Sequence, residues 1–204
     1  NEINVSGKLI LSIEEIANLL EFETGEYISR EKLLKSSDNI KKQLSIEGYA
    51  FAKINPVPEK ILNSNDVNIS FYIDPGNRTY IRRINITGNV TTQDEVFRRE
   101  IRQMESSWYS LDNIEESKAR LQRLAFVESV RVDEVRVIGS SNKIDLNVNI
   151  VEKMSGNFNI GAGFGGSGTG FELNAGIEQD NFLGFGSKVA FSIQTAKTTR
   201  QYLF

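Results

Sequence analysis

The first three quarters of this 204-residue chain contain two copies of one sequence unit. The triplet "VSG" ends at Gly7 and recurs as "ITG", which ends at Gly88, so the copies are 81 residues apart at this point (88 − 7). Farther along the spacing becomes 77, where the apolar alternation of Val67–Ile73 matches that of Ile144–Ile150. A repeat of this length is one supersecondary unit, so we expect two similar small domains in tandem.

Each copy shows the pattern strand, helix, helix, strand, strand. In the second copy, "TYIRRINITG" alternates as a half-exposed strand does. Thr91 or Thr92 can cap a helix through "QDEVFRREIRQM", and Ser110 and Leu111 begin a second helix. The segments "FVESVRVDEVRVIG" and "KIDLNVNIVEK", joined by "GSSN", then form a hairpin. About 75 residues suffice for such a small sheet covered by two helices.

The composition changes after Met154. Residues 155–204 hold ten of the sixteen glycines and only six charged side chains. Apolar and polar residues alternate strictly, as in Phe171–Glu178 and Lys188–Gln194, over the roughly ten residues that a tilted strand needs to cross a bilayer. A soluble sheet with one wet face has the same period. The glycines, which are poor in soluble strands, and the aromatic residues near the segment ends favour a membrane barrel.

Nothing in the residue types favours an enzyme. Gly161, Gly163 and Gly166 have the G-x-G-x-x-G spacing of dinucleotide-binding turns, but a period of two runs through them and no helix pattern follows. His and Cys are both absent, which removes the commonest general base, the thiol nucleophile and the usual zinc ligands. With a net charge of −3, the chain is not drawn to nucleic acid. We expect no enzyme activity, cofactor, metal or nucleic-acid partner.

The sequence resembles the BamA outer-membrane protein assembly factor family over nearly its whole length. The likeness rests on "VSG" and "ITGN", "GYAFAKI", "DPGNRTYIRRINITGN", "RREIRQMES" and above all "QDNFLGFG" at residues 179–186. It implies an α+β fold of tandem polypeptide-transport-associated (POTRA) domains, each β-α-α-β-β, followed by the opening antiparallel strands of a transmembrane β-barrel. Residues 1–76 and 77–153 would be the penultimate and last POTRA domains, and residues 154–204 the first three barrel strands and the start of a fourth. Because membrane barrels need about eight strands or more, we expect this barrel to be truncated.

The resemblance also implies a function that consists of binding, without bond chemistry. The POTRA domains would receive unfolded outer-membrane proteins by β-augmentation, and a weak first barrel strand would template their insertion into the outer membrane. Residues 1–153 would lie in the periplasm of a Gram-negative cell and residues 154–204 in the lipid bilayer. A protein-translocating relative and a soluble peptide-binding scaffold are the alternatives, and a nucleotide-dependent enzyme is the least favoured reading.

Three groups of residues are candidates for these contacts. The seam strand would have inward-facing glycines without packing, and it comprises Phe158, Ile160, Gly161, Gly163 and Phe164. A turn motif, either a plain tight turn with glycines at positive φ or a special element of the periplasmic rim, comprises Gln179, Asp180, Asn181, Phe182, Leu183, Gly184 and Gly186. The resemblance suggests that periplasmic partner lipoproteins contact Arg98, Arg99, Arg102 and Glu105, although a solvated helix face has the same composition. We expect Trp108 and Tyr109 to staple the second helix to the sheet rather than to contact a client.

Overall fold

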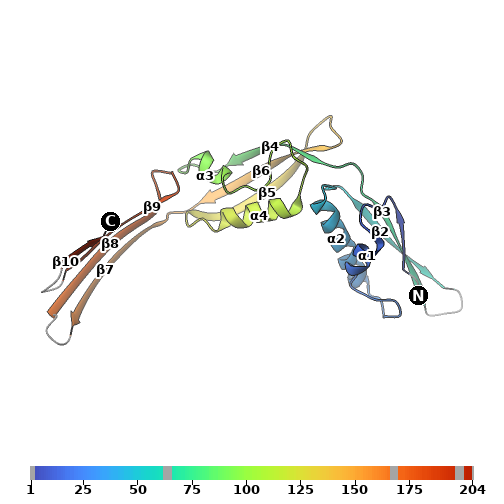
Figure 1. The fold of residues 1–204 in the computed structure, drawn as a ribbon, viewed down its shortest axis with the longest axis horizontal. Helices are drawn as coiled ribbons and strands as arrows, with labels where there is room; N and C mark the ends of the chain where they lie inside the picture. The colour runs from blue at the N-terminus through green and yellow to red at the C-terminus, as the bar shows by residue number, and fades with distance from the viewer. Residues whose placement is uncertain (1–2, 62–65, 166–169, 196–199, 204) are drawn as a thin grey trace. The chain divides into compact units, whose positions relative to one another are not determined.

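A computed structural model describes residues 3–61, 66–165, 170–195 and 200–203 of the chain (Figure 1). The elements are, in order, β1 (Ile3–Gly7), α1 (Ile13–Asn18), α2 (Arg30–Ile46), β2 (Lys53–Lys60), β3 (Val67–Asp74), β4 (Tyr80–Thr87), α3 (Asp94–Arg98), α4 (Leu111–Gln122), β5 (Val127–Arg136), β6 (Lys143–Glu152), β7 (Gly156–Gly165), β8 (Gly170–Phe182), β9 (Ser187–Thr195) and β10 (Arg200–Leu203). The chain forms two compact units. Unit 1 comprises Asn1–Ile84, Gln103–Glu115 and Glu134–Leu146, and unit 2 comprises Asn85–Arg102, Glu116–Asp133 and Asn147–Phe204.

The strands form three sheets, with the orders β1-β3-β2, β4-β6-β5 and β10-β9-β8-β7. In the first sheet, β1 runs parallel to β3 and β2 runs antiparallel to it. The order strand, helix, helix, strand, strand therefore occurs twice before β7, as the two sequence copies predict. The four-stranded sheet that follows is antiparallel throughout.

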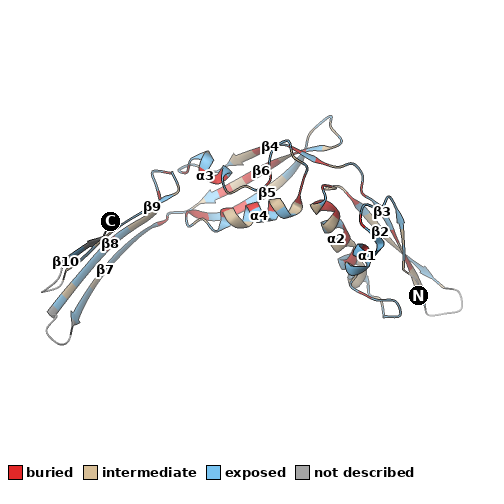
Figure 2. Ribbon diagram, in the orientation of Figure 1, coloured by how far each residue is buried: buried red, intermediate tan, exposed pale blue. Residues whose placement is uncertain are grey.

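One buried core of unit 1 lies between the first sheet and its two helices. Ser12 begins α1 with a reciprocal capping box to Glu15, and Ser29 caps α2 by accepting from the amide of Lys32. Apolar side chains at helical spacing on α2 then meet the alternating apolar side chains of β3. Figure 2 shows buried positions on both elements. The buried cluster comprises Leu11, Ile16, Phe22, Ile40, Leu44, Ala52, Ile69, Phe71 and Ile73.

The glycine of each repeated triplet has a structural reason. Gly7 has φ +115, and a Cβ on it would lie 2.1 Å from the carbonyl oxygen of Ile73. In unit 2, Gly88 has φ +87, and a Cβ would lie 1.9 Å from the carbonyl oxygen of Ile150. Both conditions exclude other residues, because positive φ is strained for side chains with a Cβ and the neighbouring backbone leaves no room. The repeat in sequence is therefore a repeat in geometry.

The second copy differs from expectation in its first helix. A helix was expected to run through residue 104 with a threonine cap, but α3 ends at Arg98 and its N-cap is Gln93, which makes no side-chain capping bond. The amides of Thr91 and Thr92 instead donate to the carboxylate of Glu152, which lies about 60 residues farther along the chain. The other expectations hold, since α4 begins at Leu111 and the hairpin forms with β5 and β6.

Trp108 and Tyr109 have different environments in unit 1. Tyr109 is buried, and its hydroxyl donates to Glu134 Oε1 at 2.8 Å. Burial, reinforced by the Glu134 carboxylate, raises the pKa of the Tyr109 hydroxyl. Trp108 is half exposed, and the guanidinium of Arg78 stacks 4.4 Å from its ring centroid. Tyr109 therefore has the expected packing role, while Trp108 meets the segment that links the two sequence copies.

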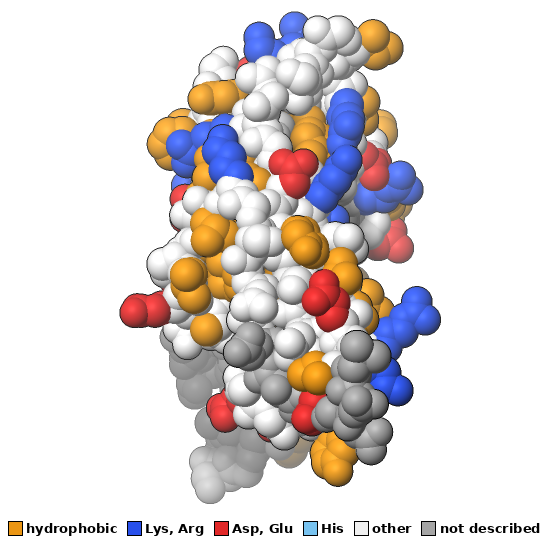
Figure 3. All heavy atoms as spheres, turned by 90° about the vertical axis from the view of Figure 1, so that its right-hand side faces the viewer, with side chains coloured by type: hydrophobic (Ala, Val, Ile, Leu, Met, Phe, Trp, Pro, Cys, Tyr) orange, Lys and Arg blue, Asp and Glu red, His pale blue; other side chains and the backbone are white. Residues whose placement is uncertain are grey.

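The molecular surface carries charges of both signs. On the face shown in Figure 3, Lys and Arg side chains lie among Asp, Glu and apolar side chains. Within the described ranges, no helix is both long enough and apolar enough to cross a membrane. The described residues also contain no cluster of three or more acidic side chains placed to hold a metal ion.

Candidate functional site

The seam strand β7 is an edge of the four-stranded sheet. All ten of its residues pair with β8, from Gly156 opposite Gln179 to Gly165 opposite Gly170. Its apolar side chains are bare, with Phe158 71%, Ile160 70% and Phe164 85% exposed. Neighbouring strands continue this exposed apolar face with Phe171, Leu173, Ile177, Val189 and Ile193. An exposed face of this extent requires a covering that the described protein does not supply.

The other face of β7 is more closely packed than expected. A Cβ on Gly161 would lie 2.1 Å from the side-chain oxygen of Asn174, its partner on β8. In the reciprocal pair, a Cβ on Gly176 would lie 2.4 Å from the side-chain oxygen of Asn159. The prediction that the glycines lack packing is thus wrong at Gly161, because an asparagine side chain lies across it. It holds at Gly163, where a Cβ would have no neighbour within 4 Å. Gly166, the last glycine of the G-x-G-x-x-G spacing, lies outside the described residues.

The turn motif connects β8 to β9, and the register of the two strands shifts between Gln179 and Phe182. Gly184 and Gly186 have φ +79 and +66, as expected for a tight turn, and Leu183 also has a positive φ of 52. The side chain of Asn181 holds the turn from inside, because its Oδ1 accepts from the amide of Gly186 at 2.8 Å. Asp180 lies 3.6 Å from the ammonium of Lys188. The apolar side chains of Phe182, Leu183 and Phe185 remain exposed.

The same turn is fastened to the loop before α3, within unit 2. Asn181 Nδ2 donates to Thr92 Oγ1 at 2.7 Å, and both residues are buried. The amide of Gln93 donates to the carbonyl of Gly184 at 3.0 Å. At Gly184 the two backbones are so close that a Cβ would lie 2.3 Å from the carbonyl oxygen of Thr91. The turn motif is therefore a tight turn that also binds the loop before α3, and this second role was not predicted from the sequence.

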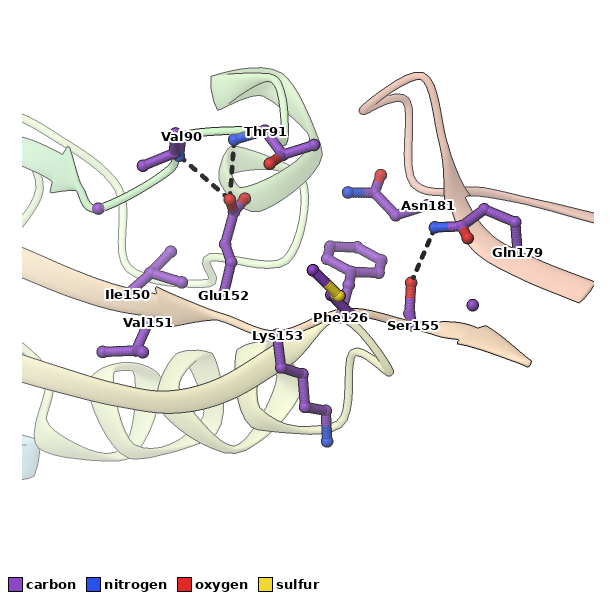
Figure 4. Close-up of a pocket in the computed structure, with 13 residues that line it drawn as sticks. Val90, Thr91, Phe126, Ile150, Val151, Glu152, Lys153, Ser155, Gln179 and Asn181 are labelled. Atoms are coloured by element: carbon purple, nitrogen blue, oxygen red, sulfur yellow. Dashed lines mark hydrogen bonds between the residues drawn. The ribbon is translucent and has the colours of Figure 1, made fainter. Parts of the chain in front are cut away.

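Glu152, the last residue of β6, binds the loop before α3, which also contacts the β8–β9 turn (Figure 4). Its carboxylate accepts from the amides of Val90, Thr91 and Thr92 at 3.1, 2.8 and 2.9 Å. Burial by itself would raise the pKa of this carboxyl group. The hydrogen bonds from the Thr92 side chain and from the three amides outweigh that effect and leave the pKa lowered.

A cavity of about 630 Å³ opens beside this carboxylate. Residues of the loop, the end of β6, the segment before β7 and the base of β8 line it. On one side of the cavity, Gln179 Nε2 donates to Ser155 Oγ at 3.3 Å (Figure 4). The side chain of Lys153 points away from Glu152. The cavity thus follows the connection between the second α+β domain and the strands after it.

The four residues expected to contact a partner are held in different ways. Arg98 pairs with Asp94, and the guanidiniums of Arg99 and Arg102 lie 3.9 Å from Glu100 and 3.8 Å from Glu116. All three arginine side chains are about half exposed. Glu105, in unit 1, uses its carboxylate to accept from the amide of Ile84 in β4 at 2.7 Å.

Two α+β domains built from one repeat, followed by antiparallel strands with a bare apolar face, define a chain of tandem POTRA domains joined to barrel strands. A family model described as "POTRA: Surface antigen variable number repeat" matches residues 1–76 and 79–153, and the chain belongs to this family. It is similar to the outer membrane protein assembly factor BamA of Neisseria meningitidis, with 34% identity over 91% of this chain and 23% of the relative. BamA of Buchnera aphidicola is 32% identical over 93% of this chain and 30% of the relative.

Solved structures agree with this assignment. A crystal structure of BamA from Haemophilus ducreyi that lacks POTRA domains 1–3 matches 96% of this chain and 37% of that chain, with a TM-score of 0.81 and 34% identity. The POTRA3–5 structure of Haemophilus influenzae BamA matches 74% of this chain and 60% of that chain, with a TM-score of 0.66 and 28% identity. The resemblance to BamA and the expected fold class are confirmed. The chain spans less than a third of the length of the curated relatives named above, which are named as assembly factors and not as enzymes.

Proposed function

We propose that this chain is the part of an outer-membrane protein assembly factor in which periplasmic POTRA domains meet the membrane barrel. Residues 1–76 and 77–153 form the penultimate and last POTRA domains, and residues 154–204 begin the barrel. The POTRA domains receive unfolded outer-membrane proteins as extended strands. The first barrel strand then offers its free edge as a template for insertion.

The observation that carries this proposal is the edge position of β7 beside a bare apolar face. Hydrocarbon is the covering that such a face fits, and a strand entering hydrocarbon must satisfy every backbone N–H and C=O, because each unpaired group costs several kcal/mol there. A free strand edge supplies the missing partners. Gly163, where an added Cβ would have no neighbour within 4 Å, has no side chain to hold this edge and favours its local opening.

The same proposal gives the cellular location of each part of the chain and the residues that contact a partner. Residues 1–153 lie in the periplasm of a Gram-negative cell, and residues 154–204 lie in its outer membrane. The half-exposed guanidiniums of Arg98, Arg99 and Arg102 offer donors to a periplasmic partner lipoprotein. Glu105 contributes less directly, because its carboxylate accepts from the backbone of β4.

Hydrogen exchange in lipid tests the templating step. We expect the amides of residues 157–165 to exchange faster than those of residues 171–178, because β8 is paired on both sides and β7 on one. Adding an unfolded β-barrel client should slow exchange in β7 more than in β8. Equal protection of the two strands, with or without client, would remove β7 as the template.

A further inference from the structure

The glycine-rich sequence of β7 specifies its alignment with β8 only weakly. Four of its ten residues are glycines, and in such strands few side chains distinguish one pairing from the next. If β7 slid by two residues along β8, every side chain would keep its face of the sheet, but the strand would move by about 7 Å. Its free edge would then lie at another depth in the membrane. The pairing of β7 with β8 therefore needs contacts that favour one alignment.

Two reciprocal pairs on one face of the sheet join an asparagine to a glycine. The side chain of Asn174 lies over Gly161, where a Cβ would be 2.1 Å from the asparagine oxygen. In turn, the side chain of Asn159 lies over Gly176, where a Cβ would be 2.4 Å from the asparagine oxygen. Each asparagine therefore occupies space that is open only because a glycine lies opposite.

A third pair of this kind lies on the other face, at the start of β7. Gln179 is opposite Gly156, and a Cβ on this glycine would be 2.7 Å from the glutamine Oε1. The glutamine Nε2 donates to Ser155 Oγ at 3.3 Å, which orients the amide. Gly163, opposite Glu172, has no such cover, since a Cβ there would have no neighbour within 4 Å. Among the β7 glycines whose surroundings the structure describes, the covered ones thus lie in the first six residues of the strand.

A slip of two residues in either direction breaks both reciprocal pairs. In one direction Asn159 comes to lie opposite Asn174, so two amide side chains meet in the space of one. In the other direction Gly161 comes to lie opposite Gly176, and the space between them is left empty. A slip of one residue is excluded separately, because it would exchange the two faces of β7. The amide–glycine pairs therefore favour the observed register over its nearest alternatives.

We propose that Asn159, Asn174 and Gln179 are positioning residues that fix the register of β7 on β8, and thereby hold the free edge of β7 at one depth in the bilayer. They matter for the proposed function, on which this inference rests, because a template that slides would present its donors and acceptors at changing depths. The three amide side chains act through the alignment of β7 and do not contact the client strand.

Disulfide formation between β7 and β8 measures the register directly, since the sequence has no cysteine of its own. The full-length protein, with no other cysteine, is folded into lipid vesicles. Ile160→Cys with Ala175→Cys joins a native pair. Ala162→Cys with Ala175→Cys, and Ile160→Cys with Leu173→Cys, join positions that lie diagonally in the native register and come opposite only after a slip of two residues. These positions lie on the face away from the asparagines, so both reciprocal pairs stay intact.

We expect the wild-type background to form the native disulfide and little of either slipped disulfide. Asn159→Ala with Asn174→Ala should raise the slipped disulfides about tenfold, since cross-strand pairs differ by amounts of this order. Adding Gln179→Ala should raise them further. Asn157→Ala with Glu172→Ala is the matched control on the same face, and it should leave the register unchanged, because neither side chain covers a glycine.

Exchanging the two members of one pair distinguishes register control from a general loss of side chains. Asn159→Gly with Gly176→Asn moves the amide from β7 to β8 and keeps one amide opposite one glycine, so the native disulfide should again predominate. A native register in the Asn159→Ala, Asn174→Ala protein would overturn the proposal. Equal slipping in the matched control would overturn it as well.

Insertion of a client separates this proposal from the proposed function. The probe is a urea-unfolded eight-stranded β-barrel protein, added to the same vesicles. Variants that slip should insert it several-fold more slowly, and the exchanged pair should restore the rate. If the slipping variants insert the probe at the wild-type rate, the amide–glycine pairs still set the register, but β7 is not the template.

Discussion

At the scale of single residues, Glu152 connects the second POTRA domain to the strands that follow it. One carboxylate accepts from three consecutive amides, and the loop bearing them is gripped by the β8–β9 turn. We expect Glu152→Gln to weaken this loop by about 1–3 kcal/mol, because the amide keeps one acceptor and loses the charge. Faster hydrogen exchange at Thr91 and Thr92 is the measurement.

The stabilisation that Glu152 contributes should be lost as the pH falls. Its pKa is lowered in the folded protein, so its stabilisation is fully present above the unfolded pKa of about 4.3 and is lost as the pH falls through the lower folded value. The difference between wild type and Glu152→Gln should therefore be constant near neutral pH and vanish in acid. Glu128→Gln, at an exposed position of β5, is the control. A difference that persists in strong acid would show that the charge is not the cause.

At the scale of elements, features that depend on local sequence pattern were predicted correctly, whereas features that depend on contacts between distant residues were missed. The period-two and helical patterns predicted the repeated order of strands and helices, because each element's apolar face is encoded within a few residues. The missing threonine cap of α3 was not predictable, since the acceptor for the Thr91 and Thr92 amides is Glu152, far along the chain. The packing of Asn174 over Gly161 and the hydrogen bond from Asn181 to Thr92 depend on the same kind of contact between distant residues. Composition signals none of these pairings.

The strands of the tail permit a test of their two faces. Ile160 lies on the exposed apolar face of β7, and the neighbouring Asn159 lies on the opposite face. We expect Ile160→Arg to cost about 2–4 kcal/mol of membrane-inserted stability in the full-length protein, because an arginine on the lipid face must leave water. Asn159→Arg is the matched control and should cost much less. The measurement is urea unfolding from lipid vesicles, and equal costs on both faces would contradict a lipid-facing Ile160.

At the scale of the whole molecule, the two POTRA domains are joined by more than a peptide link. Arg78 lies between the stretches matched by the family model, donates from Nε to the carbonyl of Glu47 at 3.0 Å and stacks on Trp108. We expect Arg78→Ala to loosen this link by about 1–2 kcal/mol, from one hydrogen bond and one cation–π contact. Trp108 is the only tryptophan in the sequence, so acrylamide quenching of its fluorescence reports the change directly.

Two controls define what this last result would mean. Arg78→Lys keeps the charge but loses the planar group that stacks on the indole, so it should restore only part of the protection of Trp108. Arg82→Ala removes an arginine that pairs with Asp145 instead, and it should leave the quenching unchanged. If Arg78→Ala leaves Trp108 as protected as in the wild type, the link does not depend on this side chain. Greater quenching in Arg78→Ala alone would mean that the contact of this linker residue with the indole is what protects Trp108.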